Sequence, residues 1–402
     1  MNCDNRPLIP RKISIFAAQN SVQNMTKIQM VDLKGQYDKI REEIDQAILN
    51  VVRSTAYING PEVKSFQSEL ESYLGVKHVI ACANGTDALQ IAMMALGLKP
   101  GDEVITPNFT FIATVEVIAL LGLKPVLVDV DEKTFNMDIG ALEKAITPNT
   151  KAIVPVHLFG QCANMEEVMR IAKQKDLYVI EDTAQAISSS YTMSNGNTST
   201  AGTMGHFGCT SFFPSKNLGC YGDGGALYTN DDELADLARQ VCNHGMKVRY
   251  YHTMIGVNSR LDSIQAAILR IKLRRLDEYC AARISAADYY DEAFKAIDGI
   301  TTPYRDPKST HTFHQYTLRI TGVNRDELRE HLTKLEIPAM IYYPVPLHHQ
   351  EAFENLKSEK DNFPVTDQLS KEVLSLPMHS ELNQEQLERI TGAVLDFFKI
   401  HA

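Results

Sequence analysis

The chain has 402 residues with 44% hydrophobic content, a net charge of −10 and a pI of about 5.7. This length and composition are ample for a buried core and suggest two domains. No block of lysine or arginine stands out, which argues against a nucleic-acid partner. The longest apolar stretch, residues 115–123, is interrupted by Glu116 and is too short to span a bilayer, so we expect no membrane partner.

Seven cysteines are scattered along the chain without a Cys-x-x-Cys pair. This pattern favours a reduced, cytoplasmic protein over a disulfide framework and argues against a zinc ribbon, and we expect no metal site. Residues 1–29 contain Arg11, Lys12 and a short apolar run, but they lack the longer apolar core of a signal peptide. We therefore expect this segment to be a disordered leader.

Two helices are expected after the leader. Between residues 31 and 53, apolar side chains such as Ile40 and Ile44 recur at helical spacing on one face. Asn59-Gly-Pro61 then breaks the chain, and a second amphipathic helix follows and ends at Gly75.

The next part of the chain alternates short apolar runs with longer amphipathic ones. The candidate strands are residues 79–82, 103–106, 125–129, 152–156, 178–181, 210–213 and 226–229. The candidate helices between them are residues 86–96, 111–121, 139–146, 165–175 and 232–243. This alternation predicts an α/β domain with a mainly parallel, seven-stranded sheet. The last two strands follow each other closely, so we expect one of them to run antiparallel.

A long helix, followed by a change in the pattern of apolar and polar residues, indicates a second domain. Residues 259–283 contain neither proline nor glycine and are expected to form one helix that bridges two domains. Beyond about residue 290, short runs at 317–320 and 339–343 alternate with helices near 325–335 and 384–398. We predict a large domain at 30–275 and a smaller α+β domain at 276–402.

An acid and an amine follow two of the expected strands. Glu181-Asp182-Thr-Ala-Gln185 ends one apolar run, and Lys216 lies just beyond another. Pyridoxal phosphate (PLP) chemistry needs this pair, because the amine forms a Schiff base and the acid keeps the ring nitrogen protonated. Taken alone, Asp182 could equally be a helix N-cap and Lys216 a solvated loop residue. Gln185 lies about one helical turn after Asp182 and could reach the same face.

Other motifs supply a phosphate cradle and a ring stack. Asn84-Gly85-Thr86 opens a helix after a strand, where free N–H groups hold anions, although an ordinary N-cap would look the same. Ser211 is a further candidate phosphate ligand. Phe111 follows the next strand and could stack on a flat cofactor, while a single aromatic there is more often plain core.

A polar segment precedes the expected long helix. Within residues 256–262, Asn258 could cap that helix, and Arg260 and Asp262 could form a surface pair.

Five ordered motifs resemble those of the DegT/StrS-type nucleotide-sugar aminotransferases. They are Asn84-Gly-Thr-Asp-Ala, Thr110-Phe-Ile-Ala-Thr, Glu181-Asp-Thr-Ala-Gln, Ser211-Phe-Phe-Pro-Ser-Lys and Gly256-Val-Asn-Ser-Arg. The likeness runs from about residue 30 to the C-terminus. It implies the fold of PLP enzymes of fold type I, which is related in architecture to aspartate aminotransferase.

The resemblance also implies roles for single residues toward the cofactor. Lys216 matches the lysine that binds PLP and shuttles the proton, and Asp182 matches the acid on the ring nitrogen. The other matched positions are the amide near the ring hydroxyl, the stacking aromatic and the phosphate ligands: Gln185, Phe111, Gly85, Thr86 and Ser211. Asn258 matches a residue that reaches the phosphate from the neighbouring subunit, which implies a homodimer with shared active sites.

Substrate contacts are implied in two places. Arg260 falls where some members place a substrate-contacting arginine. Residues 342–348, Tyr-Tyr-Pro-Val-Pro-Leu-His, resemble a late motif near the sugar pocket, which suggests Tyr343 and His348 as substrate residues. Many members have histidine where this chain has Tyr342. The Pro-Val-Pro-Leu-His form looks more like members that act on 3-keto sugars than on 4-keto ones.

The function implied by the resemblance is a ping-pong transamination. Glutamate would give its amino group to the cofactor, leaving pyridoxamine phosphate as intermediate, and the keto group of a nucleotide-linked sugar, at C3, would receive it for polysaccharide biosynthesis. Three alternatives stay open. Sugar dehydratases of the family carry histidine in place of Lys216; other relatives act on a non-nucleotide cyclic ketone of the cyclitol or aminobenzoate type; and a PLP-binding regulator would lack turnover.

Overall fold

The computed structural model describes residues 27–356 and 362–401. Most of the expected leader, residues 1–29, therefore lies outside the described residues. Of its last three residues, Ile28 is only 3% exposed and packs in the core of the C-terminal domain. The two expected helices follow as α1 (Leu33–Ser54) and α2 (Pro61–Leu74), and α2 ends at Gly75, whose φ of 72° suits glycine.

A seven-stranded sheet forms the centre of the large domain. Its strands are β1 (His78–Cys82), β2 (Glu103–Pro107), β3 (Lys124–Val128), β4 (Thr150–Ile153), β5 (Tyr178–Asp182), β8 (Phe207–Ser211) and β9 (Gly225–Thr229). Their order across the sheet is β1-β9-β8-β5-β4-β2-β3. Strand β9 runs antiparallel to both neighbours, and the other pairs are parallel. The expected sheet, with one antiparallel strand near its end, is confirmed.

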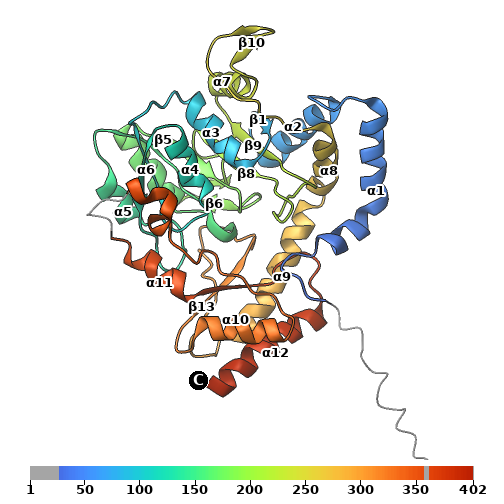
Figure 1. Cartoon of the computed structure of the whole chain (residues 1–402), viewed down its shortest axis with the longest axis vertical. Coiled ribbons are helices and arrows are strands. Elements are labelled where there is room, and N and C mark those ends of the chain that lie inside the picture. The colour runs from blue at the N-terminus through green and yellow to red at the C-terminus, as the bar shows by residue number, and fades with distance from the viewer. Residues whose placement is uncertain (1–26, 357–361, 402) are drawn as a thin grey trace, which may run out of the picture.

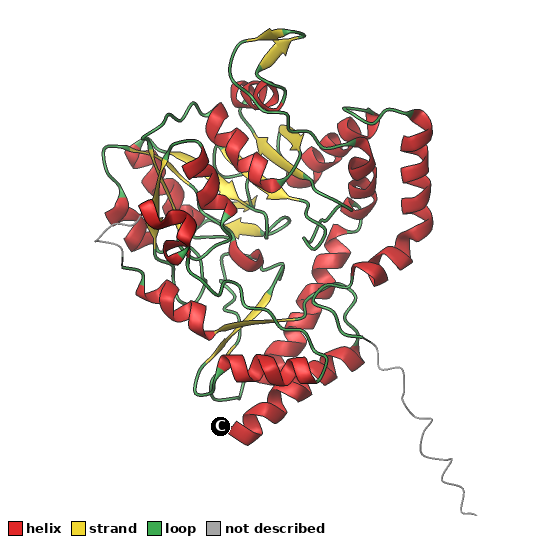
Figure 2. Cartoon of the chain, viewed as in Figure 1, coloured by secondary structure: helices red, strands yellow, loops and turns green. Residues whose placement is uncertain are grey.

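Helices cover both faces of this sheet (Figure 1 and Figure 2). One face carries α3 (Gly85–Ala95), α4 (Ala113–Leu120) and α7 (Asp232–Cys242). The other face carries α5 (Ile139–Ala145), α6 (Met165–Lys175), α2 and α8 (Ser263–Leu273). Successive strand residues point to opposite layers: Ile180 packs against the first group and Val179 against the second.

Two short hairpins extend the large domain. Strands β6 (Ser190–Thr192) and β7 (Thr198–Thr200) form one of them, between β5 and β8. Strands β10 (Met246–Val248) and β11 (Tyr251–His252) form the other, which stands out at the top of Figure 1 next to α7.

The single helix expected at residues 259–283 is wrong. The chain forms α8 and then α9 (Leu276–Phe294), and Arg275 between them has the non-helical angles φ −113° and ψ 5°. Helix α8 packs on α1 and α2, and Leu276 and Cys280 at the start of α9 share this core, whereas the rest of α9 packs in the C-terminal domain. The helix is thus interrupted at Arg275 although the segment contains neither proline nor glycine.

The C-terminal part is a smaller α+β unit below the sheet in Figure 1. Its antiparallel strands are β12 (Ile300–Thr301), β13 (Tyr316–Ile320) and β14 (Val373–Leu376), and its helices are α10 (Arg325–Lys334), α11 (Pro364–Glu372) and α12 (Gln384–His401). The strand expected at 339–343 is wrong, since only Met340 forms an isolated bridge, to Ser375. Among the helices of the described residues, none combines the length and apolar character that crossing a bilayer requires.

Candidate active site

Lys216 lies in a tight turn five residues beyond β8. Its N–H donates to the Phe213 carbonyl at 2.8 Å. Gly219 completes the turn, and a Cβ there would lie 2.3 Å from the Pro214 carbonyl oxygen, so only glycine fits. The Lys216 side chain is half-buried, and burial lowers its pKa to about 8, while the charge of Asp182 acts in the opposite direction. The amine therefore loses its proton at a lower pH than an exposed lysine does.

Asp182 is the last residue of β5 and is 7% exposed. Burial raises the pKa of its carboxyl group, against the Ala184 N–H, the Thr114 hydroxyl and the charge of Lys216. The Ala184 N–H donates to Oδ1 at 3.1 Å, and Thr114 Oγ1 donates to Oδ2 at 2.8 Å. The structure thus brings the predicted acid and amine together. It also adds Thr114 of α4, a role that sequence reasoning missed.

Gln185 is held between two segments that are distant in sequence. Its Oε1 accepts the Phe159 N–H at 2.8 Å, and its Nε2 donates to the Tyr343 hydroxyl at 3.0 Å. The ring of Tyr343 lies 6.3 Å from the ring of Phe111. Phe111 is 56% exposed, in contrast to Phe109 at 1%. Phe111 thus has a ring available to a ligand, as a stacking residue requires, while Phe109 is core.

The start of α3 forms a cradle against the ends of β8 and β9. The Asn84 side chain caps the helix by accepting the Asp87 N–H at 2.8 Å. A Cβ at Gly85 would lie 2.7 Å from the Cβ of Ser211, so glycine is needed for this close approach. N–H groups of the first helical turn have no partner within a helix, which makes such a place suitable for a phosphate.

Asn258 and Arg260 form a group of their own beside this cradle. Arg260 donates to the side chains of Asn258 and Asn243, and no pair forms with Asp262. Asp262 instead caps α8 by accepting the Gln265 N–H, so the expectation that Asn258 caps the helix is wrong. Between Asn258 and Arg260, the Ser259 hydroxyl accepts the Ala83 N–H at 3.0 Å, which places the segment next to the start of α3.

Arg260 also lines a surface pocket. Lys64 and Arg239 are the other cationic residues that line it, and Asn59 and Asn243 are among its amides. No carboxylate belongs to this lining, so the pocket suits an anionic group.

His348 joins the C-terminal domain to the loop that carries Phe111. Its Nδ1 lies 2.6 Å from Asn108 Nδ2, and its N–H donates to Asn108 Oδ1 at 3.1 Å. Because Asn108 precedes the two phenylalanines of the β2–α4 loop, this contact anchors the loop. Tyr342, the position of the family departure, is half-buried, and burial raises its pKa while its hydrogen bond to Gln315 acts in the opposite direction.

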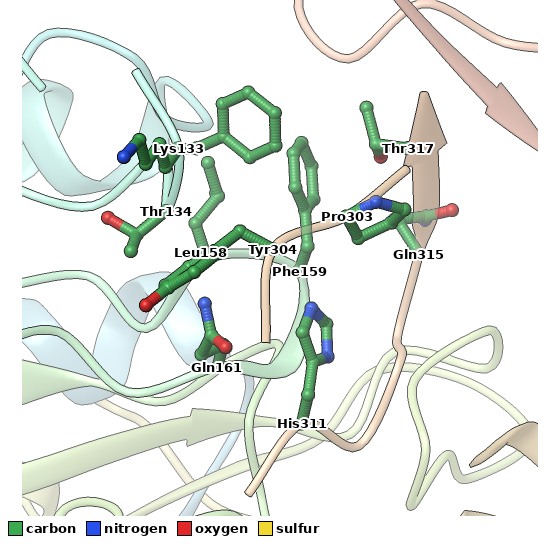
Figure 3. A pocket seen from close by; sticks show the side chains of 11 residues that line it. Lys133, Thr134, Leu158, Phe159, Gln161, Pro303, Tyr304, His311, Gln315 and Thr317 are labelled. Atoms are coloured by element: carbon green, nitrogen blue, oxygen red, sulfur yellow. The ribbon is translucent and has the colours of Figure 1, made fainter. Parts of the chain in front are cut away.

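A crevice lies where the two domains meet (Figure 3). Loops of the large domain contribute Phe135, Leu158 and Phe159, and the C-terminal domain contributes Tyr304, His311 and Gln315. Leu158 and Phe159 belong to the short helix η1 (Leu158–Gly160), so the segment that holds Gln185 also contacts the second domain.

The residues described above fit PLP group by group: an amine with a lowered pKa, a buried acid, an exposed aromatic ring and a helix start open to phosphate. Together with the sheet they define a PLP-dependent enzyme of fold type I. A family model, the DegT/DnrJ/EryC1/StrS aminotransferase family, matches residues 38–395. The chain belongs to this family and is a PLP-dependent aminotransferase.

Several curated relatives are similar over most of the chain. One is the UDP-2-acetamido-2-deoxy-3-oxo-D-glucuronate aminotransferase of Pseudomonas aeruginosa, 48% identical over 91% of this chain and 99% of the relative. Another is a pleiotropic regulatory protein of Geobacillus stearothermophilus, 45% identical over 92% and 99%. A third is the UDP-N-acetyl-3-dehydro-alpha-D-glucosamine 3-aminotransferase of Acidithiobacillus ferrooxidans, 42% identical over 92% and 97%.

A solved structure matches the fold closely. It is the crystal structure of S. venezuelae DesV in complex with a ketimine intermediate, with a TM-score of 0.88 and 38% identity over 93% of this chain and 99% of that chain. The fold of the family and its cofactor, expected from the sequence motifs, are confirmed.

Proposed function

We propose that the protein moves an amino group from glutamate to the C3 keto group of a UDP-linked sugar that feeds polysaccharide biosynthesis. The observation that carries this proposal is the pairing of Lys216, whose amine has a pKa of about 8, with the buried Asp182. The nucleotide and the keto position rest on the two relatives whose names specify UDP-linked 3-oxo or 3-dehydro sugars. Both relatives exceed 40% identity over more than nine-tenths of the chain.

When bound, PLP supplies a carbonyl carbon for an amine and a ring that accepts an electron pair. The residues of the chain would do the rest. Lys216 Nζ would take the proton from Cα of the glutamate and deliver it to C4′ of the cofactor. Asp182 stabilises positive charge on the ring nitrogen, and its bond from Thr114 fixes the carboxylate in place.

Binding and orientation would fall to the remaining residues of the site. Gly85, Thr86 and Ser211 bind the phosphate, and Phe111 covers one face of the ring. Gln185 contacts the ring hydroxyl from a position set by Tyr343. These roles fit the cradle at the start of α3 and the exposed Phe111 ring.

We propose a homodimer whose subunits share active sites. The Asn258 side chain is exposed and accepts a hydrogen bond from Arg260. Both observations support a contact between Asn258 and the phosphate of the cofactor bound in the partner subunit. The cationic pocket lined by Arg260, Lys64 and Arg239 supports contact with the diphosphate of the nucleotide. Tyr343 and His348 would lie toward the sugar. The six cysteines of the described residues are free and buried, which supports a cytoplasmic location.

The experiment compares acceptors under one assay of 2-oxoglutarate formation from glutamate. A UDP-linked 3-keto sugar, with and without a C6 carboxylate, is tested against a UDP-linked 4-keto sugar and a free cyclitol ketone. Turnover confined to the 3-keto nucleotide sugars is expected. Faster transfer to the cyclitol ketone would replace the proposal with the non-nucleotide alternative.

A second candidate, a regulator without turnover, is favoured by the name of the Geobacillus relative. Glutamate added to the PLP-loaded protein separates the two. An enzyme loses the absorbance of the lysine-bound cofactor as the amino group is transferred, whereas a regulator without turnover keeps it.

A further inference from the structure

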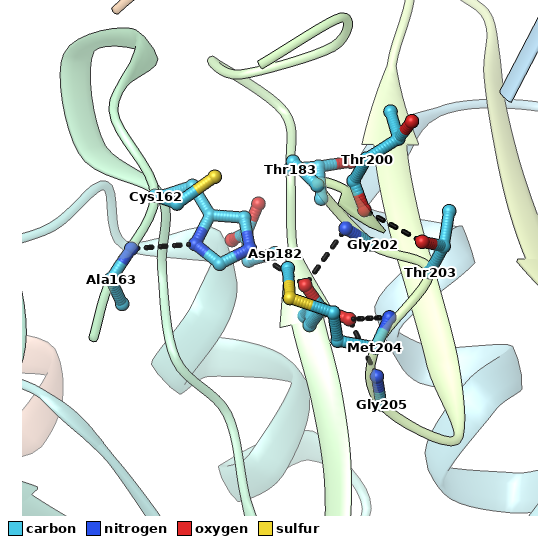
Figure 4. Close-up of polar contacts among 12 residues, drawn as sticks. Cys162, Ala163, Asp182, Thr183, Thr200, Gly202, Thr203, Met204 and Gly205 are labelled. Carbon is cyan, nitrogen blue, oxygen red and sulfur yellow. Dashed lines mark hydrogen bonds and ion pairs between the residues drawn. The ribbon is translucent and has the colours of Figure 1, made fainter. Parts of the chain in front are cut away.

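Two consecutive carboxylates at the end of β5 face opposite sides of the sheet. Asp182 faces α4, and Glu181 faces the segment that follows β7. Glu181 is fully buried, and its two oxygens accept N–H groups from Gly202 at 2.8 Å, Met204 at 2.8 Å and Gly205 at 2.6 Å. Figure 4 shows these three donors gathered beside the strand end. Catalysis as described above uses Asp182 and leaves Glu181 without a role.

His157 is the fourth partner of Glu181 and is also fully buried. Its Nε2 lies 2.8 Å from Glu181 Oε2, and its Nδ1 accepts the Ala163 N–H at 3.0 Å. Because a backbone amide can only donate, Nδ1 must carry the lone pair and Nε2 the proton. The imidazole is thereby held as one tautomer, and it closes the turn formed by residues 157–163.

This turn contacts both Asp182, the last residue of β5, and Gln185, three residues beyond it, which are the two residues proposed to contact the cofactor ring. The N–H of His157 donates to the Asp182 carbonyl oxygen at 3.0 Å. Two residues on, the N–H of Phe159 donates to Gln185 Oε1 at 2.8 Å. The main chain of the acid and the amide of Gln185 are thus both fixed by one short stretch of backbone.

The far side of the turn is fixed by the C-terminal domain. The Thr312 N–H donates to the Gly160 carbonyl at 2.9 Å, and the Gln315 N–H donates to the Phe159 carbonyl at 3.3 Å. Gly160 has a φ of 111°, and a Cβ there would lie 2.8 Å from the Phe313 nitrogen. The turn is therefore held between the two domains, and little room is left for it to shift without moving Gln185.

We propose that His157 is a positioning residue for the cofactor site. Its imidazole bridges Glu181 and Ala163, keeps the 157–163 turn closed, and through that turn fixes Asp182 and Gln185 against the cofactor ring. It touches neither substrate nor cofactor in this role. A histidine that merely filled the core would stabilise the fold without affecting the ring contacts.

The test uses a matched pair of variants in the PLP-loaded protein. His157→Gln keeps a donor that can reach Glu181 but has no ring nitrogen for the Ala163 N–H. His206→Gln is the control, because His206 Nδ1 accepts the Val179 N–H at 3.0 Å near the other end of the same strand. Both variants are expected to lower the unfolding midpoint, and His157→Gln should lower it further because His157 is fully buried and His206 only partly.

Only His157→Gln is expected to change the cofactor site. We expect its absorbance spectrum with bound cofactor to differ from that of the control and its dissociation constant for PLP to rise about tenfold. We also expect turnover at saturating PLP to fall about 100-fold, the effect of a small misplacement of reacting groups. A His157→Gln protein that matched the control in all three measurements would overturn the proposal and leave His157 a core residue.

A measurement on the wild-type protein covers the case in which His157→Gln does not fold. Nitrogen-15 shifts of the histidine rings identify which nitrogen carries the proton. We expect the proton of His157 on Nε2; a proton on Nδ1 would break the Ala163 bond and overturn the inference. The absorbance spectrum, the dissociation constant for PLP and the tautomer of His157 are all measured without a sugar acceptor. Their outcome is therefore independent of the proposed substrate.

Discussion

Replacing Lys216 by methionine is expected to stabilise the cofactor-free protein at neutral pH. Burial lowers the pKa of the Lys216 amine from its ordinary value of 10.5 to about 8. This drop corresponds to about 3 kcal/mol that the folded protein loses by keeping a protonated amine in the site. Methionine has a similar length and no charge, so Lys216→Met should recover up to about 3 kcal/mol at pH 7.

The gain should depend on pH in a defined direction. Between about pH 8 and 10.5 the unfolded chain binds a proton at Lys216 that the folded chain does not, so wild-type stability rises with pH. Below about pH 8 both states are protonated and the full cost is present. The advantage of Lys216→Met is therefore largest at pH 7 and shrinks toward zero near pH 10.5.

The assay is urea unfolding of cofactor-free wild type and Lys216→Met at pH 7, 8, 9 and 10. Lys64→Met, at an exposed position, corrects for the general effect of removing one lysine. After this correction, a gain that did not change between pH 7 and 10 would refute the reasoning. So would a Lys216→Met protein that is less stable than wild type at pH 7, because burial would then not be the cause of the lowered pKa.

Two further substitutions test the contacts of the cofactor. Gly85→Ala places a Cβ 2.7 Å from the Cβ of Ser211 and should force the start of α3 away from β8, raising the PLP dissociation constant about tenfold. An absorbance titration with PLP measures this, and an unchanged affinity would show that the cradle does not bind the phosphate. Tyr343→Phe removes the hydroxyl that accepts the Gln185 bond and should lower kcat about fivefold, the equivalent of about 1 kcal/mol. Steady-state kinetics check it, and an unchanged kcat would mean that Phe159 alone holds the amide.

Most strands of the sheet could be predicted from the sequence because they are buried on both faces. Val-Ile in β5 and Val-Ile-Thr in β2 are buried throughout, and charged residues stand only at the ends of these strands. A polar residue at such an end is either solvated or functional, which is why Asp182 and Lys216 stood out. Their proximity then followed from the rule that the carboxyl ends of parallel strands meet at one edge.

The same reasoning grouped Glu181 with Asp182 as one polar cluster, and the structure separates them. The alternation of side chains along a strand places neighbours on opposite faces, so this separation was available from the sequence. The partners of Glu181 could not be predicted from the sequence. Gly202, Met204 and Gly205 contribute backbone N–H groups, which every residue except proline has. Only His157, a polar residue just after an apolar run, offered a signal.

Contacts between distant segments were also beyond the sequence. Gln185 and Tyr343 are 158 positions apart, and their bond depends on how the two domains pack. The break at Arg275 was likewise not evident from the local sequence, and the change from the core shared with α8 to the core of the C-terminal domain comes later, within α9. Local propensity is a weak guide to where a helix is interrupted, because tertiary context overrides it.

The two ionisable groups of the site owe their shifts to one cause. Burial raises the pKa of Asp182 and lowers that of Lys216, so the site disfavours charge on both. A fold that gained its stability from an Asp182–Lys216 ion pair would shift both groups the other way. The protein instead gives up stability at this place, and the hydrogen bonds of Thr114, Ala184 and the His157 turn hold the acid in position. The result is an amine with a pKa of about 8. This lowered pKa favours catalysis, because only the unprotonated amine can attack a carbonyl carbon.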